Sequence, residues 1–188
     1  MKTLQAGVHS SQSGEVCLME AVSVLAGEVF SDTPETTCPV LATFGRSLND
    51  AMPSDETRSL LIPLIPLLIG TRDTEEREQA RAFFLADRAV RLFAPLALDA
   101  AGLTDHAQML RNMPSIVDTE TASTGAREAR AVAESAEASA WAAEATRASA
   151  WAATRATGVA RSATAAWAAE AAKDWEVAVA VFREAIAL

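Results

Sequence analysis

The chain has 188 residues, which is long enough for one domain with a full hydrophobic core or for a domain with an appendage. Half of the residues are hydrophobic, but many of these are alanine, so large core side chains are fewer than the percentage suggests. The formal net charge of −9 argues against duplex nucleic acid as a partner, because an acidic surface repels the phosphate backbone.

Cysteine content and hydrophobic runs indicate the compartment. Cys17 and Cys38 are too few for a disulfide-stabilised scaffold. The longest apolar run without alanine is residues 60–69, whereas a membrane span needs about twenty residues. Residues 1–14 are polar and lack the apolar core of a signal peptide. We therefore expect a cytoplasmic protein with no membrane partner.

The first third of the chain predicts short helices with clear end signals. Residues 14–27 are apolar on nearly every side, with Ser13 as N-cap and Gly27 as the stop, which is typical of a buried helix. A second helix is predicted over 38–50, because Pro39 suits a first helical turn.

The next helices follow from caps and prolines. Ser54 predicts a new helix start, and the prolines at 63 and 66 must break or kink the apolar run before Gly70. A long amphipathic helix is predicted from the cap at 71–78 to Gly102, with a kink at Pro95. A short helix should cover 104–112.

From Gly125 onward the composition changes. Residues 126–172 are about half alanine, the best intrinsic helix former, and are interrupted by tryptophans. Gly158 is a candidate turn between two antiparallel arms, and the apolar residues after Trp175 predict a helix that docks on a core or on a second subunit. We expect an all-α fold: a compact multi-helix globular domain (1–113), a linker (114–124), and an alanine/tryptophan-rich arm or hairpin with a C-terminal docking helix (125–188).

A buried acid marks the first candidate site. Glu20 lies in the middle of the apolar helix, where a carboxylate is costly unless it is paired or protonated. We expect Arg46 in the next helix to pair with it. Such a cluster is either a structural knot between helices or the polar part of a pocket for a small polar or nucleotide-like ligand. The candidate ligand-binding residues are Glu20, Asp32, Arg46, Asn49, Asp50, Arg81, Arg88 and Arg91.

Three of these candidates come from the long helix. Arg81, Arg88 and Arg91 lie within about 60° of one helical face. The acids Glu78 and Asp87 are placed to neutralise them as neighbours on the helix. The arginines predict either a solvated or subunit-facing surface or an anion-binding wall in an oligomer.

Catalytic chemistry in the same segment is an alternative. His9, Cys17, Glu20 and Cys38 are residue types that zinc accepts, although their spacing matches no zinc motif. Cys38 precedes a helix N-terminus, where a thiolate is stabilised, so it is a candidate nucleophile with His9 as base and Asp32 or Asp50 as orienting acid. The sequence contains no P-loop, GxGxxG, GxSxG or kinase signature.

Residues 9–110 contain a series of short motifs: Cys17-Leu-Met-Glu-Ala-Val, Leu25-Ala-Gly-Glu, Ser31-Asp, Cys38-Pro-Val, Asn49-Asp and Pro63-Leu-Ile-Pro-Leu-Leu-Ile-Gly-Thr. With these motifs the chain resembles a family of helical proteins from bacteria and their phages that carry an alanine-rich tail and have no assigned activity. The phage connection implies an inhibitor or ligand sponge that acts on host defence, which is an association and not a mechanism.

The sequence favours a non-enzymatic, homo-oligomeric helical binding protein. Its ligand is expected to be a small polar or nucleotide-like molecule or a partner protein, and no cofactor is expected. The alternative is a metal-assisted or cysteine-dependent hydrolase that uses the set His9, Cys17, Glu20 and Cys38, with zinc as the one metal considered.

Overall fold

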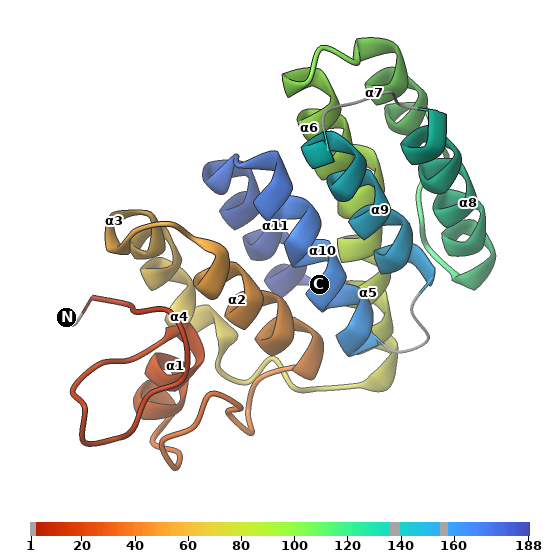
Figure 1. Ribbon diagram of the computed structural model, residues 1–188. Coiled ribbons are helices and arrows are strands. Elements are labelled where there is room, and N and C mark those ends of the chain that lie inside the picture. Colours follow the sequence, from red (N-terminus) through yellow and green to blue (C-terminus); the bar gives the residue numbers. More distant parts are fainter. Residues whose placement is uncertain (1–2, 136–139, 155–157) are drawn as a thin grey trace.

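The structure is a computed structural model that describes residues 3–135, 140–154 and 158–188 (Figure 1). Within these ranges the secondary structure is helical, apart from one isolated bridge between Leu4 and Val16. The predicted all-α fold is therefore confirmed.

The helices follow one another with short connections. Their bounds are α1 Leu18–Ala26, α2 Pro39–Ala51, α3 Asp55–Arg58, the 3₁₀ turn η1 Ser59–Leu64, α4 Ile65–Leu68, α5 Glu75–Arg88, the π-helical turn η2 Ala89–Phe93, α6 Ala94–Ala100, α7 Thr104–Arg111, α8 Thr119–Ser135, α9 Ala140–Thr154, α10 Gly158–Ala172 and α11 Trp175–Ala187.

Several of the predicted end signals act as expected. The Ser54 hydroxyl accepts a hydrogen bond from the Thr57 backbone N–H at 3.2 Å and caps α3. Pro39 occupies the first turn of α2. Gly27 ends α1 with a φ of 73°, a left-handed conformation that glycine adopts without strain.

The start of α1 differs from the prediction. The helix begins at Leu18 and not at residue 14, because the residues before it are extended. The Gln5 backbone N–H donates to the Val16 carbonyl at 2.9 Å, so this stretch pairs with the N-terminal segment instead of winding into the helix. Residues 3–17 therefore form a loop beside α1.

The predicted long helix is interrupted by the π-helical turn between α5 and α6. Pro95 lies in the first turn of α6, directly after that turn. Proline has no N–H to donate to the preceding turn, and a widened turn accommodates the missing hydrogen bond. Helix α6 ends at Ala100, and Gly102, which has a φ of 78°, lies in the connection to α7.

The alanine-rich helices share the core of the preceding domain. Helix α10 packs against α2 and α5 (Figure 1), and Ala165 and Ala169 belong to the same buried cluster as Leu41 and Phe44. Alanine lets helix backbones approach closely, so α10 fits between larger helices. The predicted division into residues 1–113 and 125–188 is thus not a division between two separate cores.

The structure also bears on the predicted linker and on the predicted turn at Gly158. The predicted linker at 114–124 is shorter than expected, because α8 already begins at Thr119. Helices α9 and α10 pack on each other as a pair, while residues 155–157, next to the predicted turn at Gly158, lie outside the described residues.

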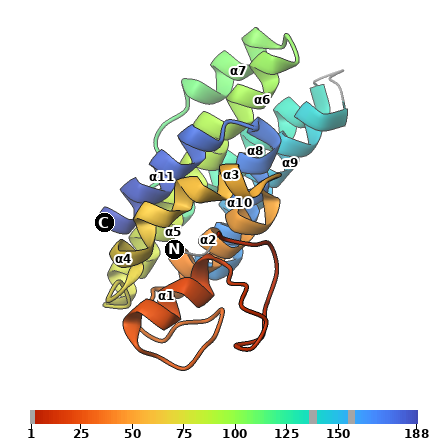
Figure 2. The same cartoon turned by 90° about the vertical axis from the view of Figure 1, so that its left-hand side faces the viewer.

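The last helix docks on the core as predicted. Phe182 of α11 is fully buried, and its ring centroid lies 5.3 Å from that of Phe44 in α2. Gly45 permits this approach, since a Cβ atom there would lie 2.8 Å from the Phe182 Cζ atom. Helix α1 and its flanking loops lie at one end of the molecule, opposite α6 and α7 (Figures 1 and 2).

Candidate functional site

Glu20 is the centre of a buried polar network. Its side chain is fully buried, and its Oε1 atom accepts a hydrogen bond from the His9 backbone N–H at 2.6 Å. Its Oε2 atom accepts one from the Cys17 backbone N–H at 2.7 Å and contacts the His9 Nδ1 atom at 2.9 Å. A carboxylate only accepts hydrogen bonds, so His9 carries its proton on Nδ1. The network ties the loop at residues 3–17 to the first turn of α1.

The network determines the protonation states of Glu20 and Cys17. Burial by itself raises the pKa of Glu20, but the hydrogen bonds from Cys17 and His9 outweigh it, so the pKa lies below the ordinary value. Burial raises the pKa of the Cys17 thiol to about 12, and the neighbouring Glu20 charge adds to the shift. Glu20 is therefore ionised at neutral pH, while Cys17 is protonated and a poor nucleophile.

Asn49 and Asp50, from the end of α2, hold the same loop. The Asn49 side-chain amide donates to the Gln5 carbonyl at 2.8 Å and accepts from the Leu18 backbone N–H at 3.3 Å. The Asp50 carboxylate accepts from the Gly7 backbone N–H at 2.8 Å. These predicted ligand-binding residues thus lie next to the Glu20 network and use their polar atoms to position the loop.

The expected pairing of Arg46 with Glu20 is wrong. Arg46 instead donates from Nη1 to the Asp32 backbone carbonyl at 2.7 Å, and its Nε atom lies 4.0 Å from the Asp32 carboxylate. Glu20 obtains its partners from His9 and Cys17, which are closer in sequence. The Arg46–Asp32 pair fixes the loop that follows α1.

The proposed metal and cysteine chemistry is not assembled in the described part of the chain. No group of three or more histidine, cysteine, aspartate or glutamate side chains there is placed to hold a metal ion, so the set His9, Cys17, Glu20 and Cys38 does not form one site. Cys38 is buried at the start of α2, and its backbone N–H donates to the Thr71 hydroxyl at 3.0 Å. That bond ties α2 to the turn after α4.

The three arginines predicted to share a face have different environments. Arg81 is 2% exposed and donates to the Thr71 carbonyl at 2.7 Å and to the Asp73 carboxylate at 3.2 Å. Its guanidinium therefore locks the turn before α5. Arg88 and Arg91 lie further along the helix, and both contact Asp87.

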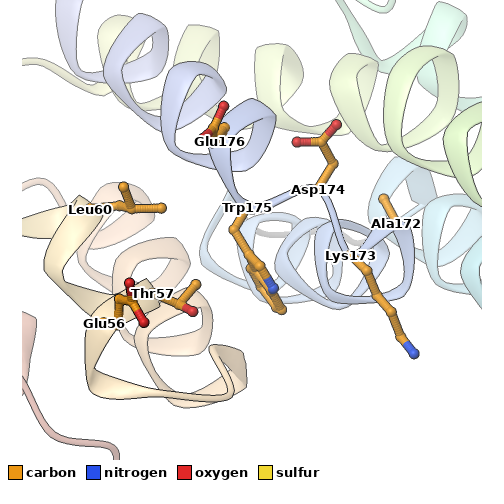
Figure 3. Close-up of a pocket in the computed structure, with 8 residues that line it drawn as sticks. All are labelled: Glu56, Thr57, Leu60, Ala172, Lys173, Asp174, Trp175 and Glu176. Carbon is orange, nitrogen blue, oxygen red and sulfur yellow. The ribbon is translucent and has the colours of Figure 1, made fainter.

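A wide, open pocket lies between α3 and the connection from α10 to α11, and its charged groups do not converge. Figure 3 shows that the Trp175 ring points toward Thr57, whereas the Lys173 amine points away. In this view the carboxylates of Asp174 and Glu176 lie above the Trp175 ring, and Glu56 lies to the left of the ring. This pocket therefore offers no cluster of charges directed at one ligand.

A second cavity, of about 470 Å³, lies over α1 and is mostly apolar. Its lining residues come from the loop at residues 3–17, from α1, from Phe30 in the loop after α1, and from Ile65 of α4. Its lining residues are Leu4, Ser11, Gly14, Glu15, Val16, Ala21, Val24, Leu25, Phe30 and Ile65. We call it the α1 cavity.

Sequence reasoning missed the α1 cavity because it treated the helix as buried on all sides. Val24 and Leu25 are each 58% exposed, and both line the cavity. The sequence carries no separate signal for these exposed positions, since a helix that is apolar all round is normally buried.

In comparisons with known proteins, no family model, no curated protein and no solved structure matched the chain. In the described part of the chain, no helix combines the length and the apolar composition that a membrane span requires. The resemblance to phage and bacterial proteins therefore stays a prediction.

Proposed function

We propose that the protein is a non-enzymatic binding protein that takes up hydrophobic side chains of a partner protein in the α1 cavity. The observation that carries the proposal is the loop at residues 3–17, which the Glu20 network holds beside α1 and not over it. A lid of apolar residues that closed over Val24 and Leu25 would bury more area, yet the polar bonds keep the cavity open.

The surface around the cavity favours a protein over a small polar ligand. The volume of 470 Å³ is within the range of ligand sites, about 300–1,000 Å³. A further apolar residue nearby in the sequence is exposed: Val29, which precedes the lining residue Phe30, is 87% exposed. Exposed apolar patches mark protein interaction sites.

The charge at the rim further describes the partner. Glu15 is the one charged residue among those that line the cavity, and its side chain is 60% exposed. The molecule as a whole carries a net charge of −9. A partner segment with apolar side chains for the cavity and a lysine or arginine beside Glu15 fits this surface, and long-range attraction would speed its association.

The hydrolase alternative has one supporting observation, the hydrogen bond from His9 to Glu20, since a buried carboxylate also orients the histidine of hydrolytic triads. A nucleophile is missing from that arrangement. Burial raises the pKa of Cys17 to about 12, and the Nε2 atom of the His9 ring lies 4.0 Å from the Glu15 carboxylate, which is not a nucleophile placed for hydrolysis. We therefore favour binding over catalysis.

The homo-oligomer and the nucleotide-like ligand stay predictions. Trp151 and Trp167, on α9 and α10, are 46% and 49% exposed, and large exposed aromatic residues are common in protein interfaces. A polar ligand has less support, because Asn49, Asp50 and Glu20 already bond the loop.

A matched pair of variants tests the proposal. Leu25 in the cavity and Met109 on α7 at the other end of the molecule are each 58% exposed, so glutamate is equally tolerated by the fold at both positions. A displayed library of helical peptides is selected on the full-length wild-type protein alone, and the affinity of each selected peptide is then measured for both variants. We expect basic amphipathic peptides, whose affinity falls about tenfold or more in Leu25→Glu and is unchanged in Met109→Glu.

The outcomes separate the possible occupants. Peptides that bind both variants equally, or no selected peptide, would contradict the proposal. Sedimentation of the same variants addresses the homo-oligomer: an oligomer that Leu25→Glu dissociates and Met109→Glu preserves would identify a second copy of the chain as the partner.

A further inference from the structure

A third cavity, of about 360 Å³, lies along α5 and η2, where it meets the loop that precedes α8. Its lining includes Phe83, Phe84, Asp87, Arg88, Arg91 and Val117. We call it the Asp87 groove. It involves neither the α1 cavity nor the loop that forms it, so it is independent of the proposed function.

The lining side chains carry more positive than negative charge. Asp87 is the one acidic side chain among the lining residues, and two guanidinium groups share it, Arg91 at 3.1 Å and Arg88 at 3.5 Å. The Asp87 Oδ1 atom also accepts a hydrogen bond from the Ile116 backbone N–H at 2.9 Å, which fixes the carboxylate in place. The side chains that line the groove therefore carry two positive charges and one negative charge.

A contact outside the groove offsets part of this charge. Arg88 also meets Glu184 of α11 at 3.4 Å, and the Glu184 side chain is 57% exposed. Ion pairs with solvent-exposed partners are weak, about 0–1 kcal/mol, so Glu184 does not hold Arg88 tightly. In a protein whose net charge is −9, the side chains that line the groove are thus less acidic than the molecule as a whole.

Arg91 presents unused donors. Its Nη1 atom bonds Asp87 and the Ser115 hydroxyl, the latter at 2.8 Å. Its Nε atom is buried without an acceptor among the described residues. A buried donor without an acceptor is costly, and native structures normally satisfy such groups with protein, water or a ligand.

The remaining walls of the groove are apolar. Arg88 lies over the Phe84 ring, with its guanidinium carbon 4.7 Å from the ring centroid, which keeps the charge at the edge of an aromatic surface. Phe83, Val117 and Leu188 complete the apolar lining. A ligand site usually has an apolar concave surface with a small number of charged or polar groups.

We propose that the Asp87 groove binds an organic carboxylate with an apolar body. The carboxylate would accept hydrogen bonds from Arg88 and Arg91, and the body would lie against Phe83, Phe84 and Val117. The same chemistry occurs in a free apolar acid and in the C-terminal carboxylate of a peptide that ends in a hydrophobic residue. Guanidinium groups recognise both through charge-assisted hydrogen bonds.

Titration calorimetry on the full-length protein tests this assignment. The probes are 4-phenylbutyrate and its primary amide, which has the same shape without the charge. We expect the acid to bind about tenfold or more tightly than the amide, and Arg88→Gln and Arg91→Gln to reduce its affinity by a similar factor. Arg77→Gln is the matched control, because Arg77 lies on the same helix, pairs with Asp73 at 2.8 Å and is outside the groove.

A further variant, at an exposed position of the Asp87 groove, tests the proposal even if an arginine substitution disturbs the fold. Val117 is 66% exposed, so Val117→Glu leaves packing intact and places a carboxylate where the anion would bind. It should weaken binding of the acid and leave binding of the amide unchanged. Equal affinities for acid and amide, no binding of the acid, or equal loss in Arg77→Gln would each overturn the proposal.

A second pair of probes identifies the source of the carboxylate. Acetyl-Gly-Phe has a free chain terminus, and its C-terminal amide lacks one. If acetyl-Gly-Phe binds about tenfold more tightly than 4-phenylbutyrate, and the amide of acetyl-Gly-Phe does not bind, the groove recognises a peptide C-terminus. Comparable affinities of acetyl-Gly-Phe and 4-phenylbutyrate would assign the groove to free acids.

Discussion

At the scale of single residues, the fully buried Glu20 has the largest effect on the N-terminal end of the molecule. It accepts hydrogen bonds from the His9 and Cys17 backbones, so one carboxylate sets both the start of α1 and the path of the loop. Removing its charge while keeping its shape separates electrostatics from packing.

We predict that Glu20→Gln lowers the free energy of unfolding at pH 7 by about 1.5–3 kcal/mol, the contribution of hydrogen bonds to a buried charged group. The glutamine amide would also turn a donor toward the donors of His9 or Cys17. Urea unfolding measures the difference. Glu134→Gln, at an exposed position of α8, is the control and should leave stability unchanged.

The same substitution has a defined pH dependence. Because the folded pKa of Glu20 lies below its ordinary value, its contribution to stability is present above the ordinary pKa, near 4.5, and is lost as the pH falls through the folded value. The difference between wild type and Glu20→Gln should therefore shrink on acidification below that point. A difference that is constant or grows toward low pH would contradict the described network.

At the scale of elements, local signals predict helix starts and stops better than they predict contacts. Ser54, Pro39 and Gly27 act through their own backbone geometry, which is written in the sequence. Helix α1 starts four residues later than the sequence predicts, because Val16 pairs with Leu4 across the loop and no residue type signals that pairing. The partners of Glu20 escape prediction for the same reason, since the path of the loop brings His9 to the carboxylate.

The contact of α2 with α11 depends on Gly45. We predict that Gly45→Ala destabilises the protein by about 1–3 kcal/mol through overpacking, reduced by about 1 kcal/mol of helix propensity that alanine gains. A new Cβ would lie 2.8 Å from Phe182 and 3.1 Å from both Leu18 and Met19. Thermal unfolding measures the loss.

A second substitution in the same protein and a control substitution complete this test. Phe182→Leu in the Gly45→Ala background should recover part of the loss, because it removes the ring that the new methyl group meets. Ser47→Ala on the same helix should be close to neutral. A Gly45→Ala variant as stable as wild type would show that α11 does not approach α2 this closely.

At the scale of the whole molecule, the alanine-rich helices belong to the core and are not an appendage. Composition alone could not show this, because alanine has the same small side chain on every face of a helix and gives no direction to its packing. In the structure, Ala165 and Ala169 of α10 join Leu41 and Phe44 of α2 in one buried cluster.

We predict that a fragment of residues 1–124 does not fold cooperatively. It lacks most of α8 and all of α9, α10 and α11, and so exposes the surface of α2 and α5 against which α10 packs. Far-UV circular dichroism and urea unfolding should show reduced helicity and a broad transition. A fragment that unfolds cooperatively with the stability of the full chain would restore the predicted boundary between a globular unit and a separate arm.

The central claim is that the α1 cavity is the binding surface. Methyl NMR of the full-length protein during titration with a selected peptide tests it most directly. We predict shifts confined to the cavity methyls of Leu4, Val24, Leu25 and Ile65, with Met109 and Val117 unchanged. Shifts that cluster at Met109 or Val117, or that leave Val24 and Leu25 unchanged while the peptide binds, would contradict the claim.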